Sequence, residues 1–345
     1  ISGALSETMT VEYGTLDDSY DVTCYIVRDE TVYYSGESGS IEYHFAEGDG
    51  VRANTQVVTA GTSGGASEKD YSAYNKRANS VRDMSAVLSP QGRLDQVKSE
   101  LQQKAAEASE AEKTDEADRI NKYISSISDI SDKSSGKNDS ADESVPSDQF
   151  GVKGSDTAKT SGTLSYMIDG YESVLNPYTI GLLDKEKLES LNYDMYNADT
   201  GKTYKGEPMF KIVDRHAWYA VTWVDAAALG SFSEGTSIDL KLPKGNVQGT
   251  VDKIYDDGDE IMVVMKFNNY YEDLASIRKI KTKITASDHN GLLIDSSFIV
   301  TKDGQPGVYV VGVTGKETFT PVKILNSDGS NTIIAANYYY EQTDE

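Results

Sequence analysis

Two short segments of this chain share one pattern although about 110 residues separate them. Ser38–Val51 reads SGSIEYHFAEGDGV, and Ser161–Glu172 reads SGTLSYMIDGYE. Each opens with Ser-Gly, continues as an alternating strand and reaches an acidic turn that contains Gly. Alternation of apolar and polar residues is typical of a strand with one buried face, and Gly suits a tight turn. We therefore predict that the two segments are halves of one small β domain, opened by an insertion.

The insertion is predicted to be helical. Ser67 with Asp70 resembles a capping box, Pro90 suits the first position of a helix, and Thr114-Asp115-Glu116 is typical of a helix start. Apolar residues then recur at spacings of three and four, as Leu94, Val97, Leu101, Ala105 and Ala108 and as Ile120, Ile124, Ile127 and Ile130. Such narrow stripes favour an antiparallel hairpin of two helices, each about 20 residues or roughly 30 Å long.

Strand patterns dominate the N-terminal stretch, where Val, Tyr, Ile and Thr are frequent. Three strands are predicted there: Thr8–Tyr13, Ser19–Val27 and Thr31–Tyr34. Gly14 and the pair Asp17-Asp18 are expected to break them. Residues 131–160 are rich in Ser, Asp, Lys and Gly and have almost no apolar residues, which is typical of a flexible linker.

The C-terminal half is also predicted to be β. Six strands suggest a small barrel or sandwich: Met209–Val213, Trp218–Val224, Ser237–Leu242, Asn246–Tyr255, Glu260–Phe267 and Ile277–Ile284. A short helix is expected at Leu183–Leu191 and one helical turn at Asp225–Leu229. The N-terminal strands are expected to return and pair with a last group of strands between Leu292 and Ala336.

The chain has 345 residues and a formal net charge of −23. So acidic a surface repels nucleic-acid phosphates and anionic lipid headgroups, so neither is expected as a direct partner. The single cysteine, Cys24, lies in a predicted strand, where a buried and unreactive thiol is expected. The sequence has no run of 18 apolar residues that would span a membrane. Because it begins at Ile1, we expect an N-terminal anchor or signal upstream.

No constellation of residues predicts catalysis or metal binding. His44, His216 and His289 are far apart and lack ligand spacing. An acidic group could attract Ca²⁺ but lacks the twelve-residue loop pattern, so a solvated hairpin turn is expected; its members are Asp256, Asp257, Asp259 and Glu260. The 23 tyrosines, including Tyr338-Tyr339-Tyr340, suit strands or, alternatively, a carbohydrate-stacking surface. We predict a protein that is not an enzyme, with no catalytic, cofactor-binding or metal-binding residues.

The order of these parts resembles the HlyD-like membrane fusion proteins, also called periplasmic adaptor subunits. Ser40–Val58 and Gly162–Ile168 are similar to the two halves of that family's lipoyl-like, or barrel-sandwich hybrid, domain. Trp218–Leu242 is similar to its β-barrel. The stretch from Gly291 to Val311 is similar to its closing membrane-proximal strands. The ending Asp169-Gly170-Tyr171-Glu172 and the polar insert look most like adaptors of single-membrane, Gram-positive bacteria.

The chain also departs from the family pattern. A functional lipoyl or biotinyl carrier needs a modifiable lysine at the tip between its two halves. Here the chain leaves into the helices at that place, and no lysine occupies a matching turn, so no such cofactor is expected. The helical hairpin is also short compared with those that reach an outer-membrane channel.

The resemblance implies a mainly β fold with an α-helical hairpin insertion, made of a split lipoyl-like domain, a six-stranded β-barrel and a membrane-proximal β domain. The predicted division is 1–35, N-terminal strands pairing with the membrane-proximal domain; 36–62, lipoyl-like first half; 63–132, helical hairpin; 133–160, flexible linker; 161–206, lipoyl-like second half with a short helix; 207–285, β-barrel; and 286–345, membrane-proximal β domain.

The resemblance further implies an adaptor on the extracytoplasmic face of the cell membrane, anchored by an N-terminal segment that precedes this chain. Such a protein assembles with a membrane transporter, an ABC or other exporter, and can form homo-oligomers. Two alternatives remain open at this point. One is a cell-surface or cell-division scaffold with the same fold, and the other is a secreted glycan-binding β module.

Overall fold

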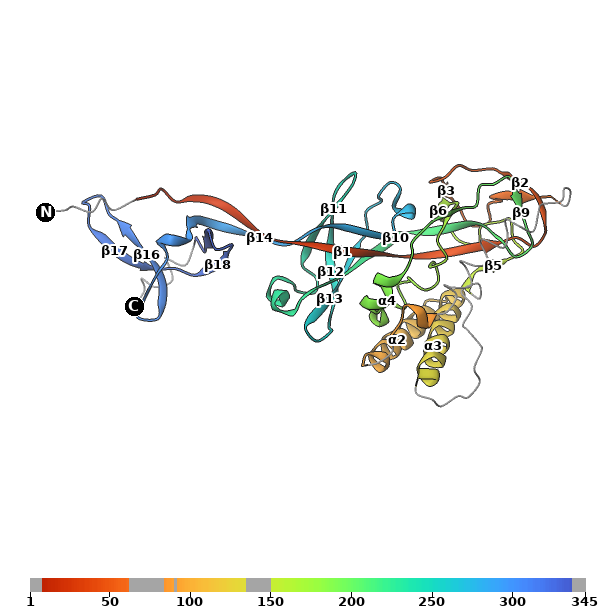
Figure 1. Cartoon of the computed structure of the whole chain (residues 1–345), viewed down its shortest axis with the longest axis horizontal. Coiled ribbons are helices and arrows are strands. Elements are labelled where there is room, and N and C mark those ends of the chain that lie inside the picture. Colours follow the sequence, from red (N-terminus) through yellow and green to blue (C-terminus); the bar gives the residue numbers. More distant parts are fainter. Residues whose placement is uncertain (1–7, 62–83, 90–91, 135–149, 337–345) are drawn as a thin grey trace.

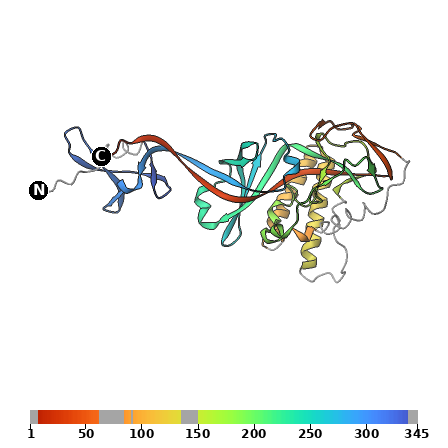
Figure 2. The ribbon, with the colours of Figure 1, turned by 45° about the horizontal axis from the view of Figure 1, so that its top comes forward.

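The computed structural model describes residues 8–61, 84–89, 92–134 and 150–336. The molecule is elongated, with a small β module at one end, a β-barrel in the middle and a third β module beside two helices at the other end (Figure 1). Two long strands, β1 (Glu12–Tyr34) and β14 (Lys279–Asp295), run side by side and connect the end module to the barrel. The same arrangement is visible from a second direction (Figure 2).

The barrel is a closed ring of six strands, because each strand pairs with the next and β14 pairs back with β1. In ring order the other four are β10 (Pro208–Asp225), β13 (Glu260–Phe267), β12 (Gly245–Asp256) and β11 (Ser237–Leu242). The predicted count of six is confirmed, but the membership differs. Met209–Val213 and Trp218–Val224 belong to one strand, β10, and the N-terminal β1 supplies the remaining strand.

The predicted breaks at Gly14 and Asp17-Asp18 are wrong, because β1 is one strand of 23 residues. Over Glu12–Asp17 it pairs with β14 in a ribbon that water reaches, so Gly and Asp need no apolar neighbours there. A register shift between Asp17 and Ser19 absorbs the irregularity as a bulge. Gly14, Asp17 and Asp18 therefore lie within the strand and do not end it.

The module that carries the helices is built from short strands around a core of its own. These strands are β2 (Gly39–Tyr43), β3 (Gly50–Val51), β4 (Val58–Ala60), β5 (Val152–Lys153), β6 (Gly162–Ser165), β7 (Met167–Ile168), β8 (Tyr196–Asn197) and β9 (Lys202–Thr203). Tyr33 of β1 and Phe210 of β10 stack in its core with ring centroids 4.5 Å apart. Strands β1 and β10 thus continue from the barrel into this module.

Part of the predicted linker is structured. Strand β5 pairs in parallel with Tyr33 and Tyr34 of β1, and Ala158 is fully buried. The backbone of Asp156 accepts hydrogen bonds from Val57 and Val58. Polar composition predicted flexibility over 133–160, but backbone pairing fixes residues 150–160 without needing apolar side chains.

The helical hairpin consists of α2 (Leu94–Glu110) and α3 (Thr114–Ser134), as the two apolar stripes predicted. Glu112, with φ of 58°, turns the chain between them. Smaller helical elements are η1 (Met84–Ala86), η3 (Ile180–Leu182), α4 (Lys185–Ser190), η4 (Ala226–Ser231) and η5 (Leu274–Ser276). The predicted capping box at Ser67 and the helix start at Pro90 lie outside the described residues.

The end module, which we call the terminal module, holds η6 (Ser296–Phe298) and five short strands. They are β15 (Val300–Lys302), β16 (Gln305–Val311), β17 (Glu317–Pro321), β18 (Ile324–Ser327) and β19 (Asn331–Ile334). Strand β19 pairs with the end of β14, and β15, β16 and β17 form a separate sheet. Its buried apolar cluster is small: Ile294, Val322 and Ile334.

Candidate functional site

The two segments of similar sequence come together as predicted. Gly50 and Val51 of β3 pair antiparallel with Thr163 and Gly162 of β6. At the first acidic turn the Gly48 amide donates to the carbonyl of Leu164 at 3.0 Å, and Gly48 has a φ of 85°. A side chain at Gly162 would meet the carbonyl oxygen of Val213 at 2.4 Å, so the β6–β10 contact needs glycine there. One split β domain results, with the helices inserted between its halves.

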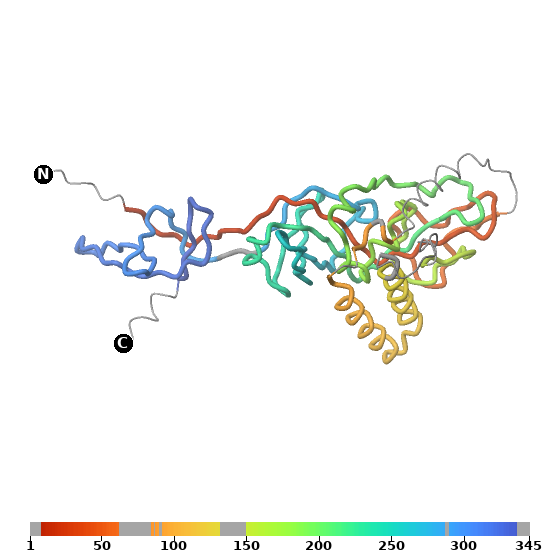
Figure 3. The backbone as a smooth tube through the Cα atoms, turned by 60° about the horizontal axis from the view of Figure 1, so that its bottom comes forward, coloured from red at the N-terminus to blue at the C-terminus, as the bar shows by residue number. Residues whose placement is uncertain are grey.

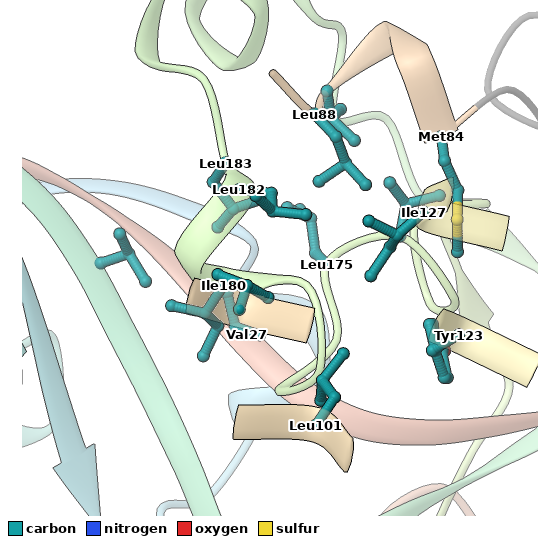
Figure 4. Packing of buried hydrophobic residues seen from close by; sticks show 14 of the residues in the cluster. Val27, Met84, Leu88, Leu101, Tyr123, Ile127, Leu175, Ile180, Leu182 and Leu183 are labelled. Atoms are coloured by element: carbon teal, nitrogen blue, oxygen red, sulfur yellow. The ribbon is translucent and has the colours of Figure 1, made fainter. Parts of the chain in front are cut away.

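The helical hairpin is held against the barrel by a shared apolar core. The stripes of α2 and α3 pack with the outward side chains of β1, β10 and β13 and with residues 171–191. Leu101, Tyr123 and Ile127 of the two helices belong to this core together with Val27 and Ile180; Figure 4 shows Val27 beside Ile180 and Ile127 beside Met84. The sequence predicted helix–helix packing alone; the stripes in fact cover a third surface as well, so the hairpin is braced at its inner face.

Strand β1 explains how barrel and hairpin share residues. Side chains alternate across a strand, so Cys24 and Ile26 point into the barrel core, whereas Tyr25 and Val27 join the core under the hairpin. All four are buried. Burial on both faces produces a continuous apolar run instead of an alternating one.

Four ion pairs tie the helical region to the barrel strands, and the longest joins Glu100 of α2 to Lys253 of β12 at 3.9 Å. Arg93, which precedes α2, contacts Asp257 at 3.1 Å, and Lys185 of α4 contacts Glu260 at 2.6 Å. Arg119 of α3 contacts Asp29 of β1 at 2.5 Å. Asp257 also accepts a 2.7 Å hydrogen bond from the indole of Trp223. The acidic turn was predicted to be only solvated, but two of its carboxylates, Asp257 and Glu260, form ion pairs with the helical region.

A buried cluster of six charged side chains, which we call the junction network, lies where the split domain meets the barrel. Arg278 contacts Glu30 at 2.6 Å and Asp169 at 2.6 Å. Lys211 contacts Glu30 at 2.9 Å and Glu172 at 3.3 Å. All these side chains are 0–3% exposed. Asp169 and Glu172 belong to the second half-segment, so the acidic ending of that segment connects the two modules.

Arg28 completes the junction network. Its Nε contacts Glu30 at 3.1 Å, and its Nη1 donates to the carbonyls of Leu274 and Ile277. These carbonyls belong to the first residue of η5 and to the residue that follows η5, just before β14. Buried charges are expensive unless each is paired and hydrogen-bonded, and here every member has a partner on another segment. The network therefore fixes the relative placement of β1, β10, β14 and residues 169–172.

The carboxylates of the network have opposite pKa shifts. Burial alone would raise the pKa of Glu30, but Arg278, Arg28 and Lys211 hold it well below its usual range. For Glu172, burial and the negative charge of Asp169 raise the pKa to about 7, against the attraction of Lys211. Glu30 thus stays ionised, whereas Glu172 titrates near neutral pH.

Sequence reasoning missed this network because its members are spread from Arg28 to Arg278. Each alone is a polar residue in or beside a strand. One signal was available: Lys211 lies between Phe210 and Ile212 in a run of apolar residues that is buried on both faces. A charge inside such a run indicates a buried partner.

Residues 30–214 match a family model described as RND related, barrel-sandwich hybrid domain, and residues 218–288 match the RND-related β-barrel domain. The first match alone covers more than half of the chain. The chain belongs to this RND-related family. Its membership confirms the predicted resemblance to membrane fusion proteins and the predicted fold class, a mainly β protein with a barrel-sandwich hybrid, a β-barrel and a helical hairpin.

Several solved structures are similar to this RND-related chain. ZneB from Cupriavidus metallidurans is 14% identical over 94% of this chain and 87% of that chain, with a TM-score of 0.31. MacA from Actinobacillus actinomycetemcomitans is 13% identical over 96% of both chains, with a TM-score of 0.36. The membrane fusion protein Spr0693 from Streptococcus pneumoniae R6 is 15% identical over 80% and 98%, with a TM-score of 0.27. No curated protein matches the chain.

The remaining residues singled out in the sequence lie apart from the junction of this RND-related protein. Cys24 is fully buried in the barrel, and burial raises the pKa of its thiol to about 12, as an unreactive cysteine requires. His44 contacts Thr59, and His216 contacts Asp214. His289 pairs through its backbone with Leu16. Within the described ranges no three His, Cys, Asp or Glu side chains are grouped to hold a metal.

The tyrosines are mostly strand and core residues. Of those described, Tyr13, Tyr270 and Tyr309 are the most exposed, and they lie on β1, the loop after β13 and β16. Tyr338-Tyr339-Tyr340 lie outside the described residues. This distribution over three elements does not favour the glycan-stacking alternative.

Proposed function

We propose that this chain is a non-enzymatic, extracytoplasmic adaptor that assembles with a membrane transporter, an ABC or other exporter, for export. The observation that carries the proposal is membership in the RND-related barrel-sandwich hybrid family, combined with a helical hairpin inserted between the two halves of that domain. Such a protein acts by holding partners in place, so the chemistry lies at interfaces and not in a catalytic pocket.

The braced hairpin supports this role mechanically. Strand β1 enters all three modules, the junction network fixes the split domain on the barrel, and four ion pairs hold the helical region. These features make the split domain, hairpin and barrel one body.

The proposed location is the extracytoplasmic face of the cell membrane, where an N-terminal anchor segment holds the protein, and the proposal includes assembly into a homo-oligomer. Nucleic acid is not a proposed partner, because the chain carries a net charge of −23. None of the helices in the described part of the chain is long and apolar enough to cross a membrane.

Co-purification tests the proposal. Full-length tagged protein is recovered from detergent-solubilised native membranes, and its partners are quantified by mass spectrometry. Leu101→Asp places a charge in the core under the hairpin, and Gln102→Asp is the matched control at an exposed neighbour. We expect a transporter permease with the wild type and Gln102→Asp, and at least a tenfold loss with Leu101→Asp. Recovery of only wall or division proteins would contradict export and favour the scaffold alternative.

A further inference from the structure

Exposed apolar side chains are concentrated at one end of the molecule. Ten large apolar residues of the described chain are exposed, and all but Leu229 and Tyr270 lie on the terminal module or on residues 9–13, at and just before the start of β1. The other end carries the split domain, so the apolar end is distal to the helices (Figure 3). Exposed apolar patches of this kind mark protein or membrane contact sites.

The hairpin of β16 and β17 has an apolar tip. Tyr309, Val310 and Val311 are each about half exposed, and Val313 is completely exposed. Alternating side chains point to opposite faces of a strand, so both faces of β16 are apolar and open to water. The Gly312 amide donates to the carbonyl of Lys316, and Gly315 has a φ of 76°, so the tip is a closed turn.

An apolar groove continues from this tip into the module. Its volume is about 860 Å³, and Val308, Val310 and Val322 are among its lining residues. Thr8 and Ala336, the first and last described residues, line the same groove. The apolar surface therefore extends from the tip across the face where both ends of the described chain lie.

The local charge separates this surface from the rest of the chain. From Ser296 to Ile334 the terminal module has three lysines and three carboxylates, a net charge of zero in a chain of −23: Lys302, Lys316, Lys323, Asp303, Glu317 and Asp328. A tip that is apolar on both faces, has Tyr309 at its base and carries lysine beside it fits the interface between lipid headgroups and acyl chains. A protein partner would need only one such face.

We propose that the β16–β17 tip inserts into the interfacial layer of a lipid bilayer, so that the terminal module contacts lipid directly. Val310, Val311 and Val313 enter the apolar layer, and Tyr309 lies at headgroup level. This contact is independent of any transporter and of the export role. It would set the long axis of the molecule away from the membrane, with the split domain and helices at the far end.

The test uses the whole chain and neutral phosphatidylcholine vesicles. Val313→Cys is labelled with a polarity-sensitive fluorophore; the buried Cys24 does not compete, and Leu229→Cys on the barrel is the matched exposed control. We expect a blue shift of the Val313→Cys label upon vesicle addition and none for the control. No shift at the tip, as expected if a protein covers this face, or equal shifts at both sites, as expected from nonspecific adsorption, would overturn the proposal.

A second variant measures affinity. Vesicle flotation of the unlabelled chain should fall at least tenfold with Val310→Asp/Val311→Asp, because two charged groups would then have to enter the apolar layer. Leu229→Asp should float as the wild type does. Unchanged flotation of the double variant would show that the tip does not insert.

Discussion

The junction beneath the helices and the terminal module are built from the same two long strands but differ in what covers them. From Tyr25 to Tyr34, β1 is almost continuously buried; its Arg28 and Glu30 belong to the junction network, and its Asp29 pairs with Arg119 of α3. From Glu12 to Leu16 the same strand pairs with β14 along one edge, and its side chains are largely exposed. One strand is therefore a rigid core element where other layers cover its faces and a water-exposed ribbon where none does.

The largest effect is expected from removing Arg278. The change Arg278→Ala leaves Glu30 and Asp169 as buried charges without their closest cation, which typically costs about 3–5 kcal/mol. Urea unfolding followed by the fluorescence of Trp218 and Trp223, both in the barrel strand β10, measures it. The exposed Lys281→Ala is the control and should change the free energy of unfolding by less than about 0.5 kcal/mol. Equal, small effects would remove the distinction between the two regions.

A cavity should cost more under the helices than in the terminal module. Leu101→Ala removes a side chain from the large core below the hairpin, and such changes cost about 2–5 kcal/mol. Val322→Ala in the small terminal cluster should cost about 1 kcal/mol. Thermal unfolding by calorimetry compares them. A greater loss from Val322→Ala would reverse the assignment of the stable region.

The pH dependence of the junction should come from Glu172. Its pKa is about 7 in the folded protein, above the ordinary 4.5, so the folded state binds the extra proton. The contribution of Glu172 to the free energy of unfolding is therefore fully present below pH 4.5 and is lost as the pH rises through 7. Between pH 5 and 8 the free energy of unfolding should fall by on the order of 2 kcal/mol.

Glu172→Gln isolates this effect, because the amide does not titrate. Its free energy of unfolding should be flat from pH 5 to 8 in urea titrations, whereas the wild type declines. The lowered pKa values of Glu30 and Asp169 act in acid, where falling pH removes their contribution, and so lie outside this window. A variant with the same slope as the wild type would assign the titration to another group.

The smallest effect on the free energy of unfolding is expected from the ion pair between Arg93 and Asp257 of the acidic turn. Arg93 and Asp257 are partly exposed, and such pairs contribute about 0.2–1 kcal/mol. A double-mutant cycle with Arg93→Ala and Asp257→Asn measures the coupling from urea midpoints. A coupling energy above about 2 kcal/mol would mean that this ion pair, and not the apolar core, holds the helical region.

Local patterns predicted much of this architecture. The bounds of β11 and β13 agree with the sequence, and the stripes of α2 and α3 were visible because helix periodicity is a local property. The continuity of β1 could not be predicted from local patterns. Whether Gly14 ends a strand depends on pairing with β14, which is distant in the sequence. The junction network was missed for the same reason: Arg28 and Lys211 reveal their role only when the modules meet.

We infer that the split domain, hairpin and barrel form one stable body, whereas the terminal module opens separately. Native-state hydrogen exchange of the whole chain tests it most directly. Amides of α3, β10 and β13 should exchange only with the largest, shared free energy of opening, and those of β15–β17 should exchange with a distinctly smaller one. The claim would be contradicted if α2 and α3 exchanged as fast as β15–β17 while the barrel strands stayed protected.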